Sequence, residues 1–205
     1  MIHCLIFWLT AVKCIAEIQG NSESVVKKDP IKGITKSACK SPDSSQIEEA
    51  ANSMFAEYWE MFLMMNPDYA TALGDQRYDN KLSSYSLEST GEMKVIIEDF
   101  IERANRMLPR AAEGSETQNN LELFIIYLEY RLGRLTDGSY LFPISKLSTP
   151  EKNLRSLINY MTLNSTQQFQ NLIARYRATP NQIDEIIELM RQGIKKNYTL
   201  HEKSV

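Results

Sequence analysis

Apolar residues recur at helical spacing along most of the chain from residue 46 onward. In the first such segment they occupy every third or fourth position, at Ile47, Ala50, Ala51, Met54, Phe55, Tyr58, Phe62 and Met65. This spacing is typical of an amphipathic helix with one apolar face. Ser45 and Glu48 form a capping-box pattern, which predicts that the helix starts at this point.

The same periodicity predicts further helices along the chain. A short one follows Asn66-Pro67 and ends at Gly74, because proline suits the first turn and glycine the left-handed C-cap. Two longer helices are predicted over 93–108 and 121–135, the second with a Ser115–Gln118 capping box and an Asp137-Gly138 turn at its end. Three shorter ones are predicted to open at Thr149-Pro150, Ser165 and Thr179-Pro180.

Sustained alternation of apolar and polar residues, the signature of a strand, is missing from the sequence. We therefore expect an all-α fold, an irregular bundle of about six amphipathic helices. Two connections are long, 75–86 and 136–148. Long loops within a bundle often carry function or partner contacts.

The first twenty residues are typical of a signal peptide. An apolar run from Cys4 to Val12 is followed by small residues at Ala16 and Gly20, either of which could precede the cleavage site. The run is too short to span a membrane, and Lys13 interrupts it. A buried N-terminal helix is the alternative. We expect the protein to be extracellular or in the lumen of the secretory pathway.

The predicted organisation has four parts: a signal peptide (1–20), a flexible linker (21–45), a helical module (46–197) and a C-terminal tail (198–205). The linker is rich in Ser, Lys, Gly and Pro and has no helical or strand period. In a secreted chain, the sequons at Asn164 and Asn197 would be candidate N-glycosylation sites.

The chemistry available to the chain is narrow. Its 23 basic and 26 acidic residues give a net charge of -3, which does not favour a nucleic-acid partner. The two histidines, His3 and His201, lie at opposite ends of the chain, and Cys39 is the only cysteine after the leader. His201-Glu202 begins a zinc motif that lacks its second histidine. We predict no catalytic residue, metal ligand or cofactor in this chain.

The most distinctive cluster follows Gly74 and consists of Asp75, Arg77, Tyr78 and Asp79. Interleaved acid, base and aromatic residues after a helix-ending glycine can fix a loop through charged hydrogen bonds. Two interpretations stay open for these four residues: a structural anchor for the loop, or a contact to a ligand or substrate.

Several motifs resemble the opening of the domain-of-unknown-function-885 family. They are Phe55-Ala56-Glu57-Tyr58-Trp59, Asn66-Pro67, Ala70-Thr71, Leu73-Gly74-Asp75 and Arg77-Tyr78-Asp79, followed by Phe142-Pro143-Ile144, the Tyr176 segment leading to Pro180, and Gly193-Ile194. The resemblance covers about residues 47 to 196. It departs from the family at 147–150, where Leu-Ser-Thr-Pro stands in place of an expected glycine.

The resemblance implies a helical protein similar to zinc metallopeptidases, whose metal motif lies beyond the region matched here. On this basis the chain is a secreted, truncated member that is inactive alone, with zinc expected only in full-length relatives. Its partner would be the missing catalytic region or a self-associating surface. If the missing region normally covers part of Phe124, Leu128, Ile158 or Ile187, the chain alone would expose a large apolar patch there. The alternative is a stand-alone secreted helical protein that binds a partner.

Overall fold

The computed structural model describes residues 42–145 and 149–199, and every regular element in these ranges is helical. This confirms the all-α prediction. The helices are α2 (Pro42–Met65), α3 (Pro67–Ala72), α4 (Leu87–Met107), α5 (Glu116–Thr136), α6 (Pro150–Tyr160) and α7 (Thr166–Lys195), with the 3-10 turns η1 (Gln76–Tyr78), η2 (Leu108–Arg110) and η3 (Ser139–Leu141). No helix in these two ranges is long and apolar enough to cross a membrane.

The predicted signal peptide lies outside the described residues, as do most of the predicted linker, Cys39 and His201. At the described edge of the linker the boundary differs from the prediction, because α2 already begins at Pro42. Ser45 and Glu48 therefore lie within the first turns of α2, and the capping box predicted for them does not mark its start. Pro42 suits this start, since the amide hydrogen that proline lacks would have no partner there.

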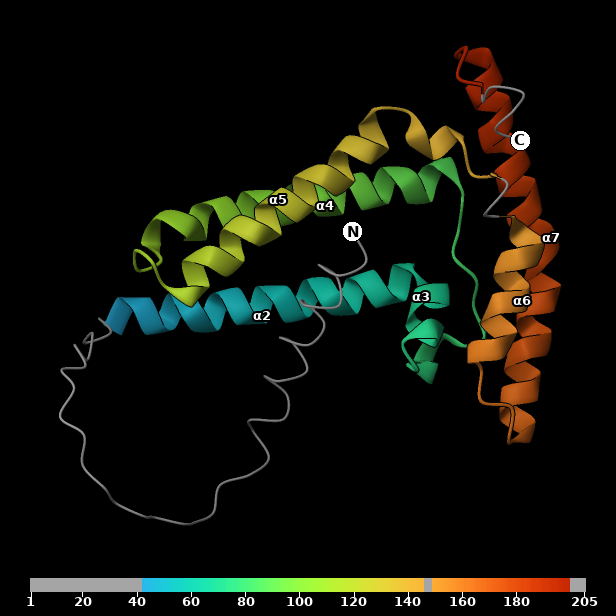
Figure 1. The fold of residues 1–205 in the computed structure, drawn as a ribbon, viewed down its shortest axis with the longest axis horizontal. Coiled ribbons are helices and arrows are strands. Elements are labelled where there is room, and N and C mark those ends of the chain that lie inside the picture. Colours follow the sequence, from blue (N-terminus) through green and yellow to red (C-terminus); the bar gives the residue numbers. More distant parts are fainter. Residues whose placement is uncertain (1–41, 146–148, 200–205) are drawn as a thin grey trace. The chain divides into compact units, whose positions relative to one another are not determined.

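The helices α2, α4 and α5 pack together (Figure 1). Aromatic side chains form the core between them. The Tyr58 ring of α2 meets Phe100 of α4 and Phe124 of α5 edge-on, with both centroid distances at 5.2 Å. Phe124 and Leu128 are buried in this core, so the expectation that they belong to an exposed patch is wrong. Each fully buried side chain of this size contributes about 1.5–3 kcal/mol.

Side-chain caps fix the start of most helices. Ser86, Ser115, Thr149 and Ser165 each accept a hydrogen bond from the backbone N–H three residues later. At α5 the predicted pattern is realised with one change. The Gln118 side chain reaches back to accept from the N–H of Gly114 at 2.8 Å, one residue before the cap.

The helix α7 runs without a break from Thr166 to Lys195 and contains Pro180. The prediction of two helices, opening at Ser165 and at Thr179-Pro180, is therefore wrong in its second start. Proline removes one backbone hydrogen bond, but packing on both sides of it keeps the helix continuous. Arg175 precedes Pro180 and Ile186 follows it, and both are buried.

The end of α7 packs closely against η3. The N–H of Tyr198 donates to the Gly193 carbonyl at 2.8 Å, and the Tyr198 ring lies 6.2 Å from Phe142. A Cβ atom at Gly138 would lie 2.7 Å from the Tyr198 ring, and Gly138 has a φ of +85°. Glycine is therefore required in this predicted turn for both its backbone conformation and its lack of a side chain.

Candidate functional site

The guanidinium of Arg175 in α7 forms the centre of a buried polar cluster. The Arg175 side chain is fully buried. Its Nε donates to the carbonyl of Lys81 at 2.8 Å, and its Nη2 donates to the Thr71 hydroxyl at 2.6 Å. Nη2 also lies 3.4 Å from the carbonyl of Pro67 and 3.3 Å from that of Tyr78. One side chain thus joins α7 to α3 and to the loop that follows it.

Asp79 supplies the negative charge of this cluster. It is 2% exposed, and its Oδ1 accepts a 2.6 Å hydrogen bond from the Thr71 hydroxyl and lies 3.9 Å from Arg175 Nη2. Burial lowers the pKa of Arg175, because desolvation penalises its charge. The nearby carboxylates of Asp68 and Asp79 oppose that effect. Such a buried pair is costly to break, since the remaining partner is left charged in a dry environment.

Two further residues of α7 fix the later part of the loop. Gln182 donates to the carbonyl of Ser83 at 2.7 Å. Glu185 accepts from the Ser84 hydroxyl at 3.0 Å and from the N–H of Tyr85 at 2.7 Å. Together with Arg175, these contacts hold residues 79–86 along α7. The long loop noted in the sequence is therefore anchored at several points.

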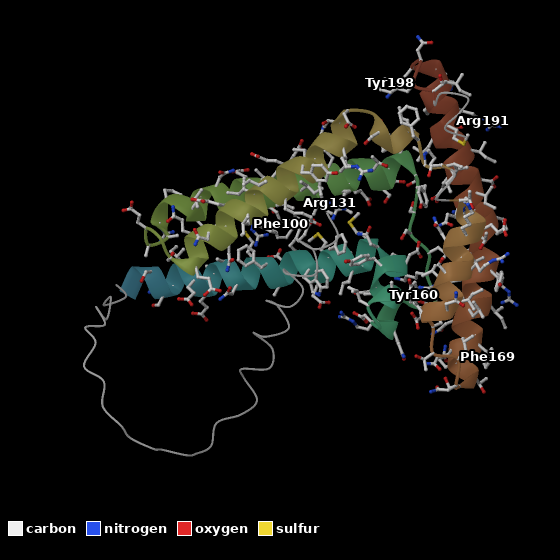
Figure 2. The ribbon with its side chains drawn as sticks, in the orientation of Figure 1. Phe100, Arg131, Tyr160, Phe169, Arg191 and Tyr198 are labelled. Carbon is white, nitrogen blue, oxygen red and sulfur yellow. The ribbon has the colours of Figure 1, made fainter. Side chains whose placement is uncertain are left out.

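The anchored loop borders an open hollow of about 360 Å³. Its wall combines one carboxylate with three tyrosines and smaller polar groups, from Asn66, Asp68, Tyr69, Ala72, Ser83, Tyr85, Asn153, Ser156, Leu157 and Tyr160. Figure 2 labels Tyr160, which extends from α6 and is 56% exposed. The hollow is thus built from α3, the 79–86 loop and α6.

Asp68 is the charged group of this wall. Its Oδ2 accepts from the N–H of Ser83 at 3.4 Å, and burial raises its pKa above the usual value. Burial, and to a lesser extent the charge of Asp68, also raise the pKa of Tyr85. Within the described residues, Asp68 Oδ1 and Arg175 Nη1 are buried and have no hydrogen-bond partner. The carboxylate is therefore incompletely satisfied by the protein itself.

The four residues predicted at this loop fall into two groups. Asp79 belongs to the buried cluster, and the backbone carbonyl of Tyr78 accepts from Arg175. Asp75 and Arg77 instead form an exposed ion pair at 2.6 Å. The hydrogen bond from Arg77 lowers the pKa of Asp75. The structure places the four residues on one loop but gives only Asp79 and Tyr78 a part in the cluster.

Glu60 of α2 completes the exposed group, because its Oε2 lies 2.6 Å from Arg77 Nη1. The Arg77 guanidinium also lies over the Tyr78 ring, with 5.5 Å between them. Exposed ion pairs of this kind contribute little to stability, since solvent screens them. This group therefore connects the loop to α2 without adding a buried charge.

Arg175 and Asp68 were missed by the sequence analysis. Arg175 carries only a weak signal: it follows the apolar Leu172 by three residues, but two other neighbours on that side of the helix, Asn171 and Thr179, are polar. Asp68 carries none, since an acidic residue in the first turn of a helix is ordinary. Both predicted sequons are exposed at their asparagines, Asn164 and Asn197, and their glycosylation stays a prediction.

The residues of 42–145 and 149–199 do not fit a metal site. Nowhere in these ranges do three or more His, Cys, Asp or Glu side chains come together in an arrangement that could hold a metal ion. Zinc requires three or four such ligands around one point. No catalytic step through zinc can therefore be derived for these residues.

In a comparison with protein families, residues 67–205 match the model described as "Bacterial protein of unknown function (DUF885)". The matched region begins at Pro67, so it includes α3, the anchored loop, α7 and every residue that lines the hollow except Asn66, and it excludes α2. Comparisons with curated proteins and with solved structures gave no match.

Proposed function

This chain belongs to the DUF885 family, whose function is unknown, and we propose that it serves a secreted, metallopeptidase-type protein as a substrate-binding helical module. In this role it holds part of a peptide and does not supply the zinc site, which would be carried by sequence outside the described residues. It is inactive on peptides by itself. The observation that carries the proposal is the anchoring of the 79–86 loop by Arg175 beside an open hollow.

The chemistry of the hollow suits a cationic group. Asp68 contributes a carboxylate that is only partly satisfied, and Tyr69, Tyr85 and Tyr160 provide aromatic faces. A carboxylate next to aromatic rings attracts ammonium and guanidinium groups through charge and cation–π contacts. We therefore propose that the hollow receives the amino terminus or a basic side chain of a peptide.

Pre-organisation supports this role. Loops that bind ligands lose affinity when they must be ordered on binding, and a loop already fixed by the protein avoids that cost. Here the backbone of residues 79–86 is held by Arg175, Gln182 and Glu185. Ser83 and Tyr85, which border the hollow, are thereby kept in place.

The test uses one short peptide in two forms, with a free and with an acetylated amino terminus, and isothermal titration calorimetry. We expect the full chain to bind the free form, and Asp68→Asn to weaken that binding about tenfold to a hundredfold, as loss of a charged contact would. Asp99→Asn is the matched control, because Asp99 is exposed on α4. Equal binding of both forms, or an equal loss with both variants, would contradict the proposal.

A second assay addresses inactivity. The full chain is incubated with zinc and a quenched fluorescent peptide, and no cleavage is expected. Zinc-dependent cleavage that survives repeated purification would contradict the assignment as a non-catalytic module.

The second candidate function is a stand-alone secreted helical protein that binds a partner. The exposed apolar residues along α7 favour it, because single apolar side chains are common on protein surfaces but long stripes mark interfaces. Mapping the 3′ end of the transcript distinguishes the two. A reading frame that continues into a zinc motif supports the module, and a stop codon after Val205 with abundant stable protein supports the binding protein.

A further inference from the structure

Besides its buried face, α7 carries a second apolar stripe that the rest of the described chain leaves exposed. Seven large side chains of this outer stripe are between 39% and 64% exposed: Phe169, Ile173, Tyr176, Ile183, Ile187, Met190 and Ile194. Pro180 occupies the remaining position of the stripe and is also exposed. Figure 2 labels Phe169 and Arg191 near the two ends of this helix.

The spacing of the outer stripe is that of a coiled coil. From Phe169 to Ile194 its residues are separated alternately by four and three positions, without interruption. An average spacing of 3.5 residues keeps the stripe facing a partner helix when the two helices supercoil around each other. A helix that packs only on its own protein needs no such regularity. The face that α7 buries against the protein is made by other residues, including Arg175, Ile186 and Leu189.

The outer stripe is also large. At 1.5 Å per residue it is about 38 Å long, and at a helix spacing of 8–10 Å it covers roughly 300–400 Å². The largest apolar patch of an ordinary monomer has about this size and is often functional. A long helical partner therefore fits the stripe better than a small molecule does.

We infer that the outer stripe of α7 binds the same stripe of a second copy of this chain, with the two helices antiparallel. A two-fold axis near residues 181 and 182 then brings every member of the stripe onto another member. The layers pair Phe169 with Ile194 of the second copy, Ile173 with Met190, Tyr176 with Ile187, and Pro180 with Ile183. Such an interface is closed, because the same surface serves both copies.

Charge complementarity selects the antiparallel arrangement. The outer flank of the stripe carries Gln170, Arg177, Asp184 and Arg191, all exposed. In the antiparallel register, Arg177 lies opposite Asp184 of the second copy, and the symmetry creates this pair twice. The other edge of the stripe lacks charge and includes Thr179 and Gly193. In a parallel dimer the outer flank of one copy would lie next to this uncharged edge of the second copy. Opposite charges at such flanking positions set partner choice and orientation.

This inference does not depend on the function proposed for the hollow. The hollow is lined by α3, the 79–86 loop and α6, whereas the outer stripe lies on α7 alone. Peptide binding and self-association can therefore succeed or fail separately.

Sedimentation equilibrium of the full chain tests the inference. We expect a reversible dimer, and Ile187→Asp should weaken its association at least about a hundredfold, because an unpaired charge would be buried in the interface. Val95→Asp is the matched control, since Val95 is β-branched and 66% exposed on α4. Circular dichroism checks that both variants keep their helices. A monomer at all accessible concentrations would overturn the inference.

A shorter exposed stripe on α5, formed by Leu123, Ile126 and Tyr130, is the competing surface. Ile126→Asp should leave the dimer intact. If Ile126→Asp dissociates the dimer and Ile187→Asp does not, the interface lies on α5 and the inference is wrong.

Thiol cross-linking tests the orientation, in a background with Cys4, Cys14 and Cys39 changed to Ser. In the antiparallel dimer the two copies of residue 183 lie about 4.5 Å apart along the helix axis, and those of residue 194 about 38 Å apart. A short cross-linker should therefore join Ile183→Cys and fail to join Ile194→Cys. Efficient joining of Ile194→Cys would indicate parallel helices and overturn the arrangement.

Charge reversal gives an independent check of the register. Arg177→Glu and Asp184→Arg should each weaken association several-fold, and the double variant should restore it. If the double variant instead loses as much dimer affinity as the two single variants together, Arg177 does not pair with Asp184.

Discussion

Phe124 in α5 and Arg175 in α7 are almost equally buried, at 1% and 0% exposure, but different forces hold them. Phe124 is surrounded by other rings, with Tyr58 5.2 Å and Phe55 5.0 Å away between centroids. Arg175 is surrounded by carbonyls, a hydroxyl and a carboxylate. Apolar packing tolerates substitutions of similar volume, whereas a buried charge needs particular partners at particular places. The α2–α4–α5 layer can therefore vary in sequence more freely than the junction between α3 and α7.

The largest expected effect is in the apolar layer. Phe124→Ala should lower the free energy of unfolding by about 3–5 kcal/mol, because a large ring is lost and a cavity remains. Urea denaturation followed by circular dichroism measures it. Leu123→Ala is the control: the neighbouring side chain is 60% exposed and should change stability by less than about 0.5 kcal/mol. Similar losses from both variants would contradict the assignment of Phe124 to the core.

At the polar junction between α3 and α7, Arg175→Met should lower the free energy of unfolding by about 3 kcal/mol. Breaking a buried ion pair typically costs about 3–5 kcal/mol, and the lower end applies because the variant also removes the desolvation penalty of the arginine itself. Unlike the loss at Phe124, this one should be local: amide hydrogen exchange should accelerate in residues 79–86 before it does in α4 and α5.

Two variants accompany Arg175→Met. Thr71→Val removes only the hydroxyl that connects Arg175 with Asp79, and it should accelerate exchange in the same loop to a smaller degree. Arg155→Met, at a side chain 76% exposed, should leave the loop unchanged. Unaltered exchange in residues 79–86 after loss of Arg175 would show that the loop does not depend on this anchor.

The smallest expected change in the free energy of unfolding concerns Asp68. Here removal of the charge should raise stability instead of lowering it. Burial raises its pKa in the folded state above the unfolded value of about 3.8, so the folded chain binds the proton more tightly than the unfolded chain does. The ionised side chain therefore lowers stability above its folded pKa, and this penalty disappears as the pH falls below 3.8. Arg175 attenuates the penalty, and the neighbouring Tyr85 is neutral throughout this range.

Asp68→Asn should accordingly unfold at higher urea concentration than the wild type at pH 7 and lose that advantage near pH 3.5. Comparison of the two proteins at each pH removes the contributions of other acids, such as Glu57, whose pKa is lowered by its hydrogen bond to Arg103. A variant less stable than the wild type at pH 7 would indicate that the attraction between Asp68 and Arg175 outweighs desolvation.

The apolar layer was largely predictable from sequence, and the polar junction was not. Periodic residues such as Tyr58 and Phe100 report which face of a helix is buried, because each contributes to a repeated pattern. Contacts of Arg175 lie 94 to 108 residues away along the chain, and no local pattern encodes such a distance. The Asp75–Asp79 cluster showed that the loop carries charged contacts, but not which of its residues is buried.

The error at Pro180 has the same cause, because a sequence pattern reports only on residues that are close together in the chain. A Thr-Pro pair is a common helix start, and from sequence alone a break at Thr179 is the reasonable interpretation. The continuity of α7 depends on packing on both sides of the proline, at Arg175 and Ile186. Tertiary contacts thus override a local signal, and the regular outer stripe of α7 becomes visible only after that correction.

The distance in sequence between Arg175 and its partners also sets an order of events during synthesis. All residues of α2, α4 and α5 have been made by Thr136, so that layer can pack while the ribosome is still working. The loop of residues 79–86 has to wait for Arg175, about a hundred residues after Pro67 and Thr71. At roughly 5–20 residues per second this delay is about 5–20 s. For that time Asp79 stays accessible to solvent and to chaperones, although it is buried in the finished protein.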